Sequence, residues 1–350
     1  MMVQCCYICG VTLAVLHVFS VILPSLKGSL AEEQEVPYDR NAYGSTIVNF
    51  HNFSFYIQPR ACEARHTLLV AVHSSVRNQK KREIIRNTWG NPKLLNNFLP
   101  KDFQIKLIFI VARSVMATHQ LLVGYEAEMF SDILQINYID HYRNNTYKAL
   151  YNMRWITSEE GCPHVTLVMK ADDDVMLNVR YFGSMWKELF NLNSSYNNLL
   201  YAGQIRKGKP FRWNRSKWYL PVTAYKFSTF PQWCLGLVYF FTPDLARQVY
   251  NLSFTTPYIY TDDVYIGIVA DRVDNLIRVD LALHYAEVLN KLAQNVHDWS
   301  SSSETFYHCS SHSTMYRLWL EYCFCKHCFS PEDYMMSYLR SLCSSDSIIQ

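Results

Sequence analysis

Short apolar runs alternate with longer segments of mixed polarity through the middle of the chain. The apolar runs are rich in strand-forming residues, and the segments between them carry apolar positions at helical spacing. Because strands that alternate with helices favour a parallel sheet, we expect one large α/β domain with a mostly parallel, helix-covered sheet. The pattern predicts strands at 67–73, 106–112, 133–136 and 165–169, and helices at 77–89, 119–130 and 146–157.

The N-terminal end has a different pattern. Residues 1–26 contain no charged side chain, and Val3 to Leu26 is almost entirely apolar. As a helix at about 1.5 Å per residue, this run exceeds the roughly 30 Å of a bilayer core. We therefore predict a short cytosolic tail and transmembrane signal-anchor in residues 1–26, followed by a luminal stem in 27–49. The alternative is a cleaved signal peptide, since small residues at Ser29 and Ala31 suit cleavage. Both interpretations place the rest of the chain in the secretory lumen.

Composition narrows the functional classes. The chain has 350 residues, 49% of them hydrophobic, and 33 basic against 30 acidic residues. That apolar content is ample for a core, and the balanced charge gives no reason to expect nucleic acid as a partner. Eight of the eleven cysteines follow the apolar segment, which suits an oxidising compartment, and their even number permits full pairing without indicating which pairs form. N-glycosylation sequons at Asn52, Asn144, Asn193, Asn214 and Asn251 agree with a luminal location.

Three adjacent carboxylates follow the strand expected at 165–169. Asp172, Asp173 and Asp174 would repel one another unless a cation lies among them. Carboxylate oxygens are the ligands that Mg²⁺ and Mn²⁺ prefer, and ligands of open α/β sheets bind beyond the carboxyl ends of the strands. The sequence thus favours a divalent metal site here over a solvated acidic turn.

Two further charged pairs have a structural and a functional interpretation each. Asp262 and Asp263 precede an apolar helix-like stretch, where they suit a helix N-terminus or, beside a metal site, a general base. Arg82 and Arg86 lie four residues apart on one predicted helix face, which suits either solvent or a diphosphate.

Several common sites are disfavoured. The sequence contains no Walker-type loop, no G-x-G-x-x-G and no G-x-S-x-G. A C-terminal group of three His and four Cys between His308 and Cys328 fits no common zinc spacing, so disulfides are favoured over zinc there.

Seven segments between about Asn52 and Trp319 form an ordered set: Lys81 to Gly90, Asp140 to Lys148, Trp155 to Cys162, Val168 to Val175, Lys217 to Tyr219, Phe230 to Gly236 and Asp262 to Gly267. In this order they resemble the inverting β-1,3-galactosyltransferase family, which includes β-1,3-N-acetylglucosaminyltransferases and is related to the Fringe enzymes.

This resemblance implies a GT-A-type nucleotide-sugar-binding domain over residues 50–345. It implies a UDP-sugar donor, most simply UDP-galactose, and a glycan acceptor on a glycoprotein or glycolipid. It also implies Mn²⁺, with Mg²⁺ as an alternative, and a single-pass type II protein of the Golgi membrane with its catalytic domain in the lumen.

The resemblance also implies roles for single residues. Asp174 and His308 match the metal ligands, and Asp263, then Asp262, match the catalytic base. Trp218 and Trp233, like Trp213, are candidates for stacking on a sugar ring, although each also suits the core. The remaining candidates for substrate binding are Arg82, Arg86, Trp89, Lys170, Asp172 and Asp173.

The chain departs from the family pattern at a few positions. Asp262 stands where Glu is usual, Ala149 where Thr is usual, and the segment Leu235 to Tyr239, expected as a loop, lacks two glycines. Transfer of N-acetylglucosamine and a non-catalytic luminal carbohydrate-binding protein of the same fold are therefore alternatives. A two-metal phosphoryl-transfer enzyme is a weaker one, since it leaves the ordered segments unexplained.

Overall fold

The computed structural model describes residues 35–95, 103–178, 185, 189, 199–281, 285–288, 306–309 and 311–325. The apolar run Val3 to Leu26, Asn193, Cys328 and Cys343 lie outside these residues, so the predictions for them remain predictions. Within the described residues, no helix has the length and apolar character needed to cross a bilayer.

The main sheet has eight strands in the order β1-β4-β3-β2-β5-β8-β7-β9. Neighbours among β2, β3, β4 and β5 pair in parallel, whereas β1, β7 and β8 join by antiparallel pairing. The sheet is therefore mixed, with a parallel block at the position that the sequence predicts. Its strands are β1 (Phe55–Ile57), β2 (Leu68–His73), β3 (Ile105–Arg113), β4 (Ile133–Ile139), β5 (Leu167–Asp172), β7 (Leu200–Arg206), β8 (Trp233–Phe241) and β9 (Ile277–Asp280).

A smaller sheet of three strands, in the order β10-β11-β6, lies beside the end of β5. It consists of β6 (Val175–Leu177), β10 (Tyr285–Val288) and β11 (Phe306–Cys309). Strand β11 pairs with β6 so that His308 lies opposite Val175, and the amide of Cys309 donates to the carbonyl of Asp174 at 2.7 Å. The small sheet thus fixes His308 next to the acidic turn.

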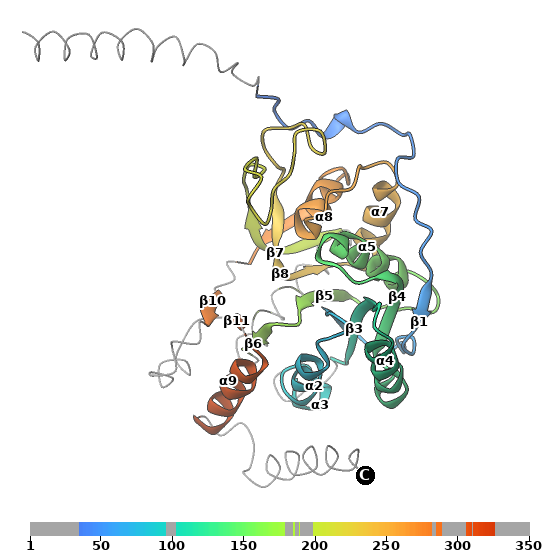
Figure 1. Cartoon of the computed structure of the whole chain (residues 1–350), viewed down its shortest axis with the longest axis vertical. Helices are drawn as coiled ribbons and strands as arrows, with labels where there is room; N and C mark the ends of the chain where they lie inside the picture. Colours follow the sequence, from blue (N-terminus) through green and yellow to red (C-terminus); the bar gives the residue numbers. More distant parts are fainter. Residues whose placement is uncertain are drawn as a thin grey trace, which may run out of the picture. The chain divides into compact units, whose positions relative to one another are not determined.

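Helices cover both faces of the main sheet (Figure 1), in three layers. One face packs against α2 (Gln79–Asn87), α3 (Pro92–Leu95), α4 (Ala117–Phe130) and α9 (His312–Cys325). The other packs against α5 (Asn145–Ile156), α7 (Pro243–Ser253) and α8 (Asp262–Asp271). Short 3₁₀ turns form at η1 (Arg40–Ala42) and η2 (Tyr142–Asn144).

Strand β2 shows why both faces need a cover. Leu68, Val70 and Val72 belong to one core cluster, and Leu69 and Ala71 to the other. All six of its residues are buried, which is typical of a parallel strand between two helical layers.

The predicted helices at 77–89, 119–130 and 146–157 and all four predicted strands are confirmed as α2, α4, α5 and β2–β5. The expectation of a loop at Leu235 to Tyr239 is wrong, because this segment lies inside β8. Its pairing with β5 sets Tyr239 opposite Lys170 and buries Val238 and Tyr239, so the residues that replace the expected glycines pack as strand residues.

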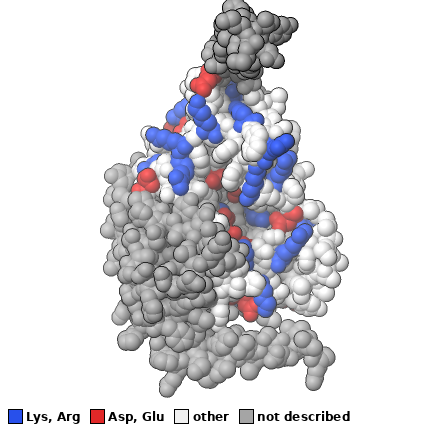
Figure 2. Space-filling view, turned by 60° about the vertical axis from the view of Figure 1, so that its left-hand side comes forward, with Lys and Arg blue, Asp and Glu red and all other residues white. Residues whose placement is uncertain are grey.

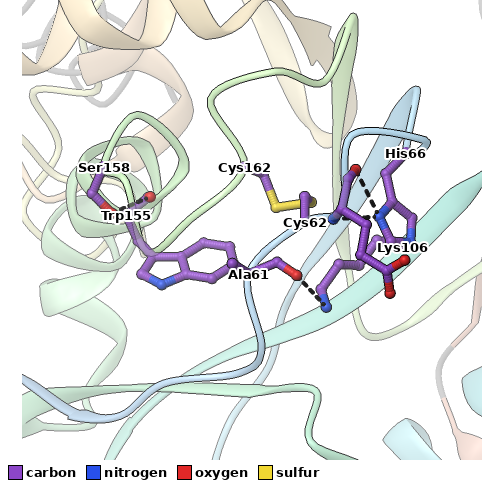
Figure 3. The surroundings of a disulfide bond; sticks show 8 residues. Ala61, Cys62, His66, Lys106, Trp155, Ser158 and Cys162 are labelled. Carbon is purple, nitrogen blue, oxygen red and sulfur yellow. Dashed lines mark hydrogen bonds between the residues drawn. A yellow bond between two sulfur atoms is a disulfide. The ribbon is translucent and has the colours of Figure 1, made fainter.

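A disulfide joins Cys62 to Cys162 across 100 residues of sequence (Figure 3). It ties the segment before β2 to the segment between α5 and β5, and the amide of Cys62 also donates to the carbonyl of Gly161 at 2.9 Å. A Cβ at Gly161 would lie 1.7 Å from the Trp155 carbonyl oxygen, so only glycine fits this turn. The disulfide suits an oxidising compartment, whereas full pairing of the cysteines does not occur, since Cys234 carries a free thiol.

Among the sequons in described segments, Asn52, Asn214 and Asn251 are exposed. Asn144 differs, because its side-chain amide donates to the Ile139 carbonyl at 3.1 Å. The three exposed asparagines are thus more accessible to a glycan than Asn144.

Removal of the disulfide should destabilise the fold, because the bond closes a 100-residue loop in the unfolded chain. Replacing Cys62 with Ser should lower the free energy of unfolding by about 2–5 kcal/mol. Denaturant titration measures this change. Cys162→Ser and the double variant should match the single variant, since each removes the same bond, and unchanged midpoints in all three would contradict a disulfide in the mature protein.

Candidate active site

A cavity of about 700 Å³ opens at the carboxyl ends of the parallel strands. The last residues of the four strands, His73, Arg113, Ile139 and Asp172, all line it. The N-terminus of α8 and strand β11 complete the wall. Its charged lining comprises six aspartates and six Lys or Arg: Asp140, Asp172, Asp173, Asp174, Asp262, Asp263, Arg77, Lys81, Arg113, Lys148, Lys170 and Lys217.

The middle aspartate of the acidic turn is fully engaged by the protein. Asp173 accepts hydrogen bonds from Ser74 Oγ at 2.7 Å, Asn78 Nδ2 at 2.7 Å and Lys81 Nζ at 3.0 Å. These donors come from the end of β2 and the start of α2. Asp173 therefore connects β5 to β2 and α2, and we assign it a structural role in the turn.

Asp174 and His308 face each other in the cavity. His308 Nε2 lies 3.7 Å from Asp174 Oδ2, and Lys81 Nζ lies 3.5 Å from the same oxygen. Burial alone would raise the pKa of Asp174, but the contact with His308 and the charge of Lys81 outweigh burial and lower it. The turn and β11 hold these side chains together through their backbones.

The Asp174–His308 pair fits a hard divalent cation in its chemistry. The carboxylate leaves positions for water and phosphate oxygens, which is how Mg²⁺ is usually held at nucleotide sites, and the imidazole adds a nitrogen ligand of the kind that transition-metal ions accept. No cluster of three or more His, Cys, Asp or Glu side chains suited to a metal occurs in the described part of the chain.

Lys170 lies beneath the cavity with 1% of its surface exposed. Its ammonium donates to Asp172 Oδ1 at 2.5 Å and to the carbonyl of Gly236. Burial acts to lower its pKa, but Asp172 and Asp262 outweigh burial and raise it, so Lys170 stays charged. Burial raises the pKa of Asp172 to about 7 against the opposing charge of Lys170, and the charges of Asp174 and Asp262 add to the increase.

Asp262 and Asp263 occupy the first turn of α8. Asp263 accepts hydrogen bonds from the amides of Gly236 at 3.1 Å and Val264 at 2.8 Å. Burial, with the neighbouring charge of Asp262, raises the pKa of Asp263 to about 6. A Cβ at Gly236 would come within 3.2–3.3 Å of the Asp263 side chain, so the glycine that β8 retains makes room for this carboxylate.

Asp262 lies closer to the opposite wall of the cavity. Its Oδ2 is 4.0 Å from His73 Nδ1, and its side chain is 21% exposed. Burial and the charges of Lys170 and Lys148 lower the pKa of His73 well below its usual value, so this imidazole is neutral. His73 Nε2 is buried and forms no hydrogen bond with the part of the protein that the structure describes.

The cavity brings together eight of the predicted site residues. Trp218 lines it and is 48% exposed. The other seven are Lys170, Asp172, Asp173, Asp174, Asp262, Asp263 and His308, of which Asp173 has the structural role described above.

The structure does not bring Arg82, Arg86, Trp89 or Trp233 to the cavity lining. Arg82 is fully buried against Glu126, with bonds of 2.7 and 2.8 Å, and Arg86 pairs with Asp132 and Glu126 at 2.7 Å. The prediction that the two arginines share one helix face is confirmed. That face packs against α4, where Glu126 and Asp132 neutralise the charges of the arginines. Trp89 is fully buried in the core.

Trp233 packs against Phe230, with ring centroids 5.7 Å apart, at the start of β8. This contact is outside the cavity lining, so stacking of Trp233 on a sugar ring has no support from its position.

Sequence reasoning overlooked Lys148, His73 and Lys81. Lys148 is 4% exposed and donates to the Ser74 carbonyl at 2.8 Å and to Asp140 at 3.0 Å. The available signal was a charged or polar residue interrupting an apolar strand or helix face, since such a residue is buried only with a partner or a function.

Comparison with known proteins identifies relatives of this chain. Residues 80–280 match the family model described as galactosyltransferase. Beta-1,3-galactosyltransferase 1 of Mus musculus and of Homo sapiens are each 32% identical over 223 residues, which is 63% of this chain and 65% of theirs. Beta-1,3-galactosyltransferase 5 of Pan troglodytes is 30% identical over 207 residues, or 59% of this chain and 66% of its own. The chain thus spans just under two thirds of these relatives.

Solved structures give a fainter likeness. Mouse xyloside xylosyltransferase 1 in its apo form has 10% identity and a TM-score of 0.31, over 71% of this chain and 98% of its own. The galactosyltransferase LgtC in complex with donor and acceptor sugar analogs has 9% identity and a TM-score of 0.37, over 77% of this chain and 99% of its own.

The family match includes Lys81, the three aspartates at 172–174 and the Asp262–Asp263 pair, and only His308 of the carboxylate–imidazole site lies beyond it. Because that match extends over more than half of the sequence, this chain belongs to the galactosyltransferase family.

Proposed function

We propose that the protein transfers galactose from UDP-galactose to a glycan hydroxyl in β-1,3 linkage, with inversion and with a divalent metal. The proposal rests on one observation, that Asp174, His308, Asp262 and Asp263 line the same cavity at the end of the sheet. One pair suits a metal–diphosphate complex, and the other suits proton transfer from an acceptor. The family membership supports galactose as the sugar.

The donor side would consist of Asp174, His308 and Lys81. Asp174 and His308 would hold Mn²⁺, or Mg²⁺, which supplies neutralisation of the charge that develops on UDP as it leaves. Lys81 lies 3.5 Å from Asp174 and is charged, because Asp173 and Asp174 raise its pKa against the opposing effect of burial. Its ammonium is thus available near the phosphates without leaving Asp173.

The acceptor side would be the first turn of α8. Asp263 removes the proton from an acceptor hydroxyl while the hydroxyl oxygen attacks C1 of the sugar. The new bond to C1 forms as the bond from C1 to UDP breaks, and UDP leaves with that electron pair. A single displacement from the opposite face converts an α-linked donor to a β-linked product.

Asp263 remains the first choice as base on the geometry. Its two backbone hydrogen bonds fix the carboxylate, and each carboxylate oxygen has a second lone pair to accept a proton. A raised pKa also brings a carboxylate nearer to the range in which a general base is efficient. Asp262 is the second choice, because it is held less firmly.

We also propose that residues 1–26 form a cytosolic tail and signal-anchor, 27–49 a luminal stem and 50–345 a GT-A catalytic domain in the Golgi lumen, with an acceptor on a glycoprotein or glycolipid. The Cys62–Cys162 disulfide supports a luminal location. Transfer of N-acetylglucosamine is the second candidate, and the small departures near β8 and Asp262 motivate it.

Asp174→Ala should abolish Mn²⁺-dependent UDP binding while the domain stays folded, because the Asp174 side chain is 30% exposed and its contacts with Lys81 and His308 are long, at 3.5 and 3.7 Å. Calorimetry with UDP in the presence and absence of Mn²⁺ measures the loss. Glu128→Ala, which removes an exposed carboxylate on α4, is the matched control. Unaltered UDP affinity in Asp174→Ala would refute its role in metal binding.

Asp173→Ala should behave differently from Asp174→Ala. It leaves Ser74, Asn78 and Lys81 without their shared acceptor, so it should lower the free energy of unfolding by about 1–3 kcal/mol. Denaturant titration of the two variants side by side measures the contrast. Equal stabilities would remove the structural assignment of Asp173.

Asp263→Asn should reduce turnover by about 10²–10⁴-fold with donor binding largely retained, because an amide cannot accept the acceptor's proton. The amide keeps the shape and one backbone hydrogen bond. Initial rates of UDP release with donor and acceptor varied separately give kcat and KM. If Asp262→Asn loses turnover and Asp263→Asn keeps it, the base is Asp262.

The pH dependence follows from the same carboxylate. Because a base must be deprotonated and the pKa of Asp263 is raised to about 6, kcat/KM should fall roughly tenfold per pH unit below about pH 6. A profile from pH 4.5 to 8 measures the inflection. Activity that stays constant down to pH 4.5 would exclude Asp263 as the titrating base.

A further inference from the structure

Positive charge is concentrated in two segments beside the cavity. Residues 207–232, between β7 and β8, contain six Lys or Arg and no Asp or Glu, and residues 141–158 contain three Lys or Arg and no Asp or Glu. The whole chain, in contrast, is nearly balanced at +3. Figure 2 shows Lys and Arg side chains gathered on the upper part of the molecule, in the region where the β7–β8 segment lies in Figure 1.

Part of this charge lies on a contiguous group of aromatic rings. Lys217 Nζ is 4.7 Å from the ring centre of Tyr142 and 5.7 Å from that of Trp218, and Trp218 packs on Phe211 with centroids 5.6 Å apart. Tyr142 also contacts Tyr260, whose ring lies 5.4 Å from the Arg143 guanidinium. We name this group the cation–aromatic shelf: Tyr142, Arg143, Phe211, Lys217, Trp218 and Tyr260.

The shelf is open to solvent. Tyr142 is 43%, Trp218 48% and Phe211 53% exposed, and Arg143 and Lys217 are exposed as well. In the described part of the protein, both cations contact only aromatic faces through their charged groups. Solvent-facing aromatic rings are a usual platform for sugar rings, whereas cations beside them provide partners for an anion.

The shelf is fastened to the predicted catalytic carboxylates. The Tyr260 hydroxyl donates to the carbonyls of Lys217 at 3.0 Å and Tyr219 at 2.8 Å, and Asp262 follows Tyr260 by two residues. Tyr142, Lys217 and Trp218 line the same cavity as Asp262 and Asp263. A sugar on the shelf would therefore lie next to the proposed base.

Charge decides which sugar suits this place. Lys81, Lys148 and Lys170 pair with aspartates of the cavity, whereas Lys217 and Arg143 contact only aromatic faces among the described residues and are open to an anion. An uncharged acceptor would gain little from these two exposed cations. Resting on the function proposed above, we propose that the acceptor is an acidic glycan. Its sugar ring stacks on Trp218 and Tyr142, and its sulfate or carboxylate group pairs with Lys217 and Arg143, away from the aspartates.

The test compares acceptors that differ in charge, using the full-length chain with UDP-galactose and Mn²⁺. The acceptors are N-acetyllactosamine, its 6-sulfated form and a desulfated chondroitin tetrasaccharide, which separate the neutral, sulfate and carboxylate cases. We expect at least one acidic acceptor to have a KM about tenfold lower than the neutral one in 50 mM salt, and this advantage to shrink in 300 mM salt. Equal KM values for all three would overturn the proposal.

Matched variants locate the effect. Lys217→Gln combined with Arg143→Gln should reduce the acidic-over-neutral ratio of kcat/KM by about five- to tenfold, as expected for two exposed charge pairs. Lys217→Arg should retain the ratio. Lys80→Gln combined with Arg247→Gln, which removes two exposed cations from α2 and α7, should leave it unchanged. An equal loss in this control pair would show that net charge, and not the shelf, sets the preference.

All proteins are also prepared on an Asn214→Gln background, so that a glycan at this exposed sequon cannot mask the neighbouring surface. Loss of the acidic preference on that background would overturn the proposal. Tighter binding of the protein to vesicles containing phosphatidylserine than to the sulfated glycan would also overturn the proposal, because it would indicate that the shelf binds a lipid surface.

Direct binding separates this proposal from the proposed function. Calorimetry with the acidic glycans alone tests the shelf without any turnover, and calorimetry with UDP and Mn²⁺ tests the donor site. UDP binding and transfer without acidic preference would overturn the shelf and leave the transferase. Acidic-glycan binding that the Lys217→Gln, Arg143→Gln variant loses, in a protein that neither binds UDP nor transfers sugar, would support the shelf and overturn the transferase.

Discussion

Six aspartates can share one cavity only because cations lie among them. Lys81 pairs with Asp173 and Asp174, Lys148 with Asp140 and Lys170 with Asp172. Lys148 and Lys170 are almost fully buried, so their charges act through a medium that screens them weakly. Most of the acidic turn is therefore neutralised within the protein. Among the described residues, Asp262 and Asp263 at the start of α8 have no Lys or Arg partner at this range.

The raised pKa of Asp263 reflects that difference. In the unfolded chain an aspartate titrates near 3.8, whereas burial and Asp262 bring Asp263 to about 6 in the folded protein. The folded state thus binds this proton more tightly, so the contribution of Asp263 to stability falls as pH rises from about 4 to about 6. At neutral pH the ionised carboxylate of Asp263 therefore lowers the stability of the fold. The proposed reaction requires this charge, because a general base must be deprotonated.

Support for the acidic turn comes from behind it. Arg82 donates from Nη1 to Ser74 Oγ at 3.1 Å and to the carbonyl of Ser75, and Ser74 donates to Asp173. Glu126 on α4 holds the other side of the guanidinium. Because removing one partner of a buried ion pair leaves an uncompensated charge, this chain of contacts fixes the end of β2 against β5. Arg82 therefore acts on the site from a distance, through Ser74 and Asp173, and not through a diphosphate.

Sequence alone could predict the elements that have strong periodicity. The apolar runs predicted strands β2 to β5. The position of Asp172 to Asp174 directly after a strand predicted that these carboxylates lie at the end of the sheet where the cavity opens. Pairing partners were beyond reach, because the side chain that meets Arg82 or Lys148 depends on contacts between residues distant in sequence. The segment at Leu235 to Tyr239 was misjudged for a similar reason. Only its register against β5 shows that Tyr239 is a strand residue under the buried Lys170.

The two walls of the cavity differ in whether their cations are paired with carboxylates. This difference determines where the donor and the acceptor would bind in the proposed reaction. On the β5 side, Lys81 and Lys170 are bonded to aspartates, so a diphosphate gains attraction there chiefly through a bridging cation. On the α8 side, Lys217 and Arg143 rest on aromatic faces and their charges face solvent. A donor that brings its own metal and an acceptor that brings an anion would thus be drawn to opposite walls. C1 of the sugar and the attacking hydroxyl would then meet between them, beside Asp263, which is the geometry that a single inverting displacement requires.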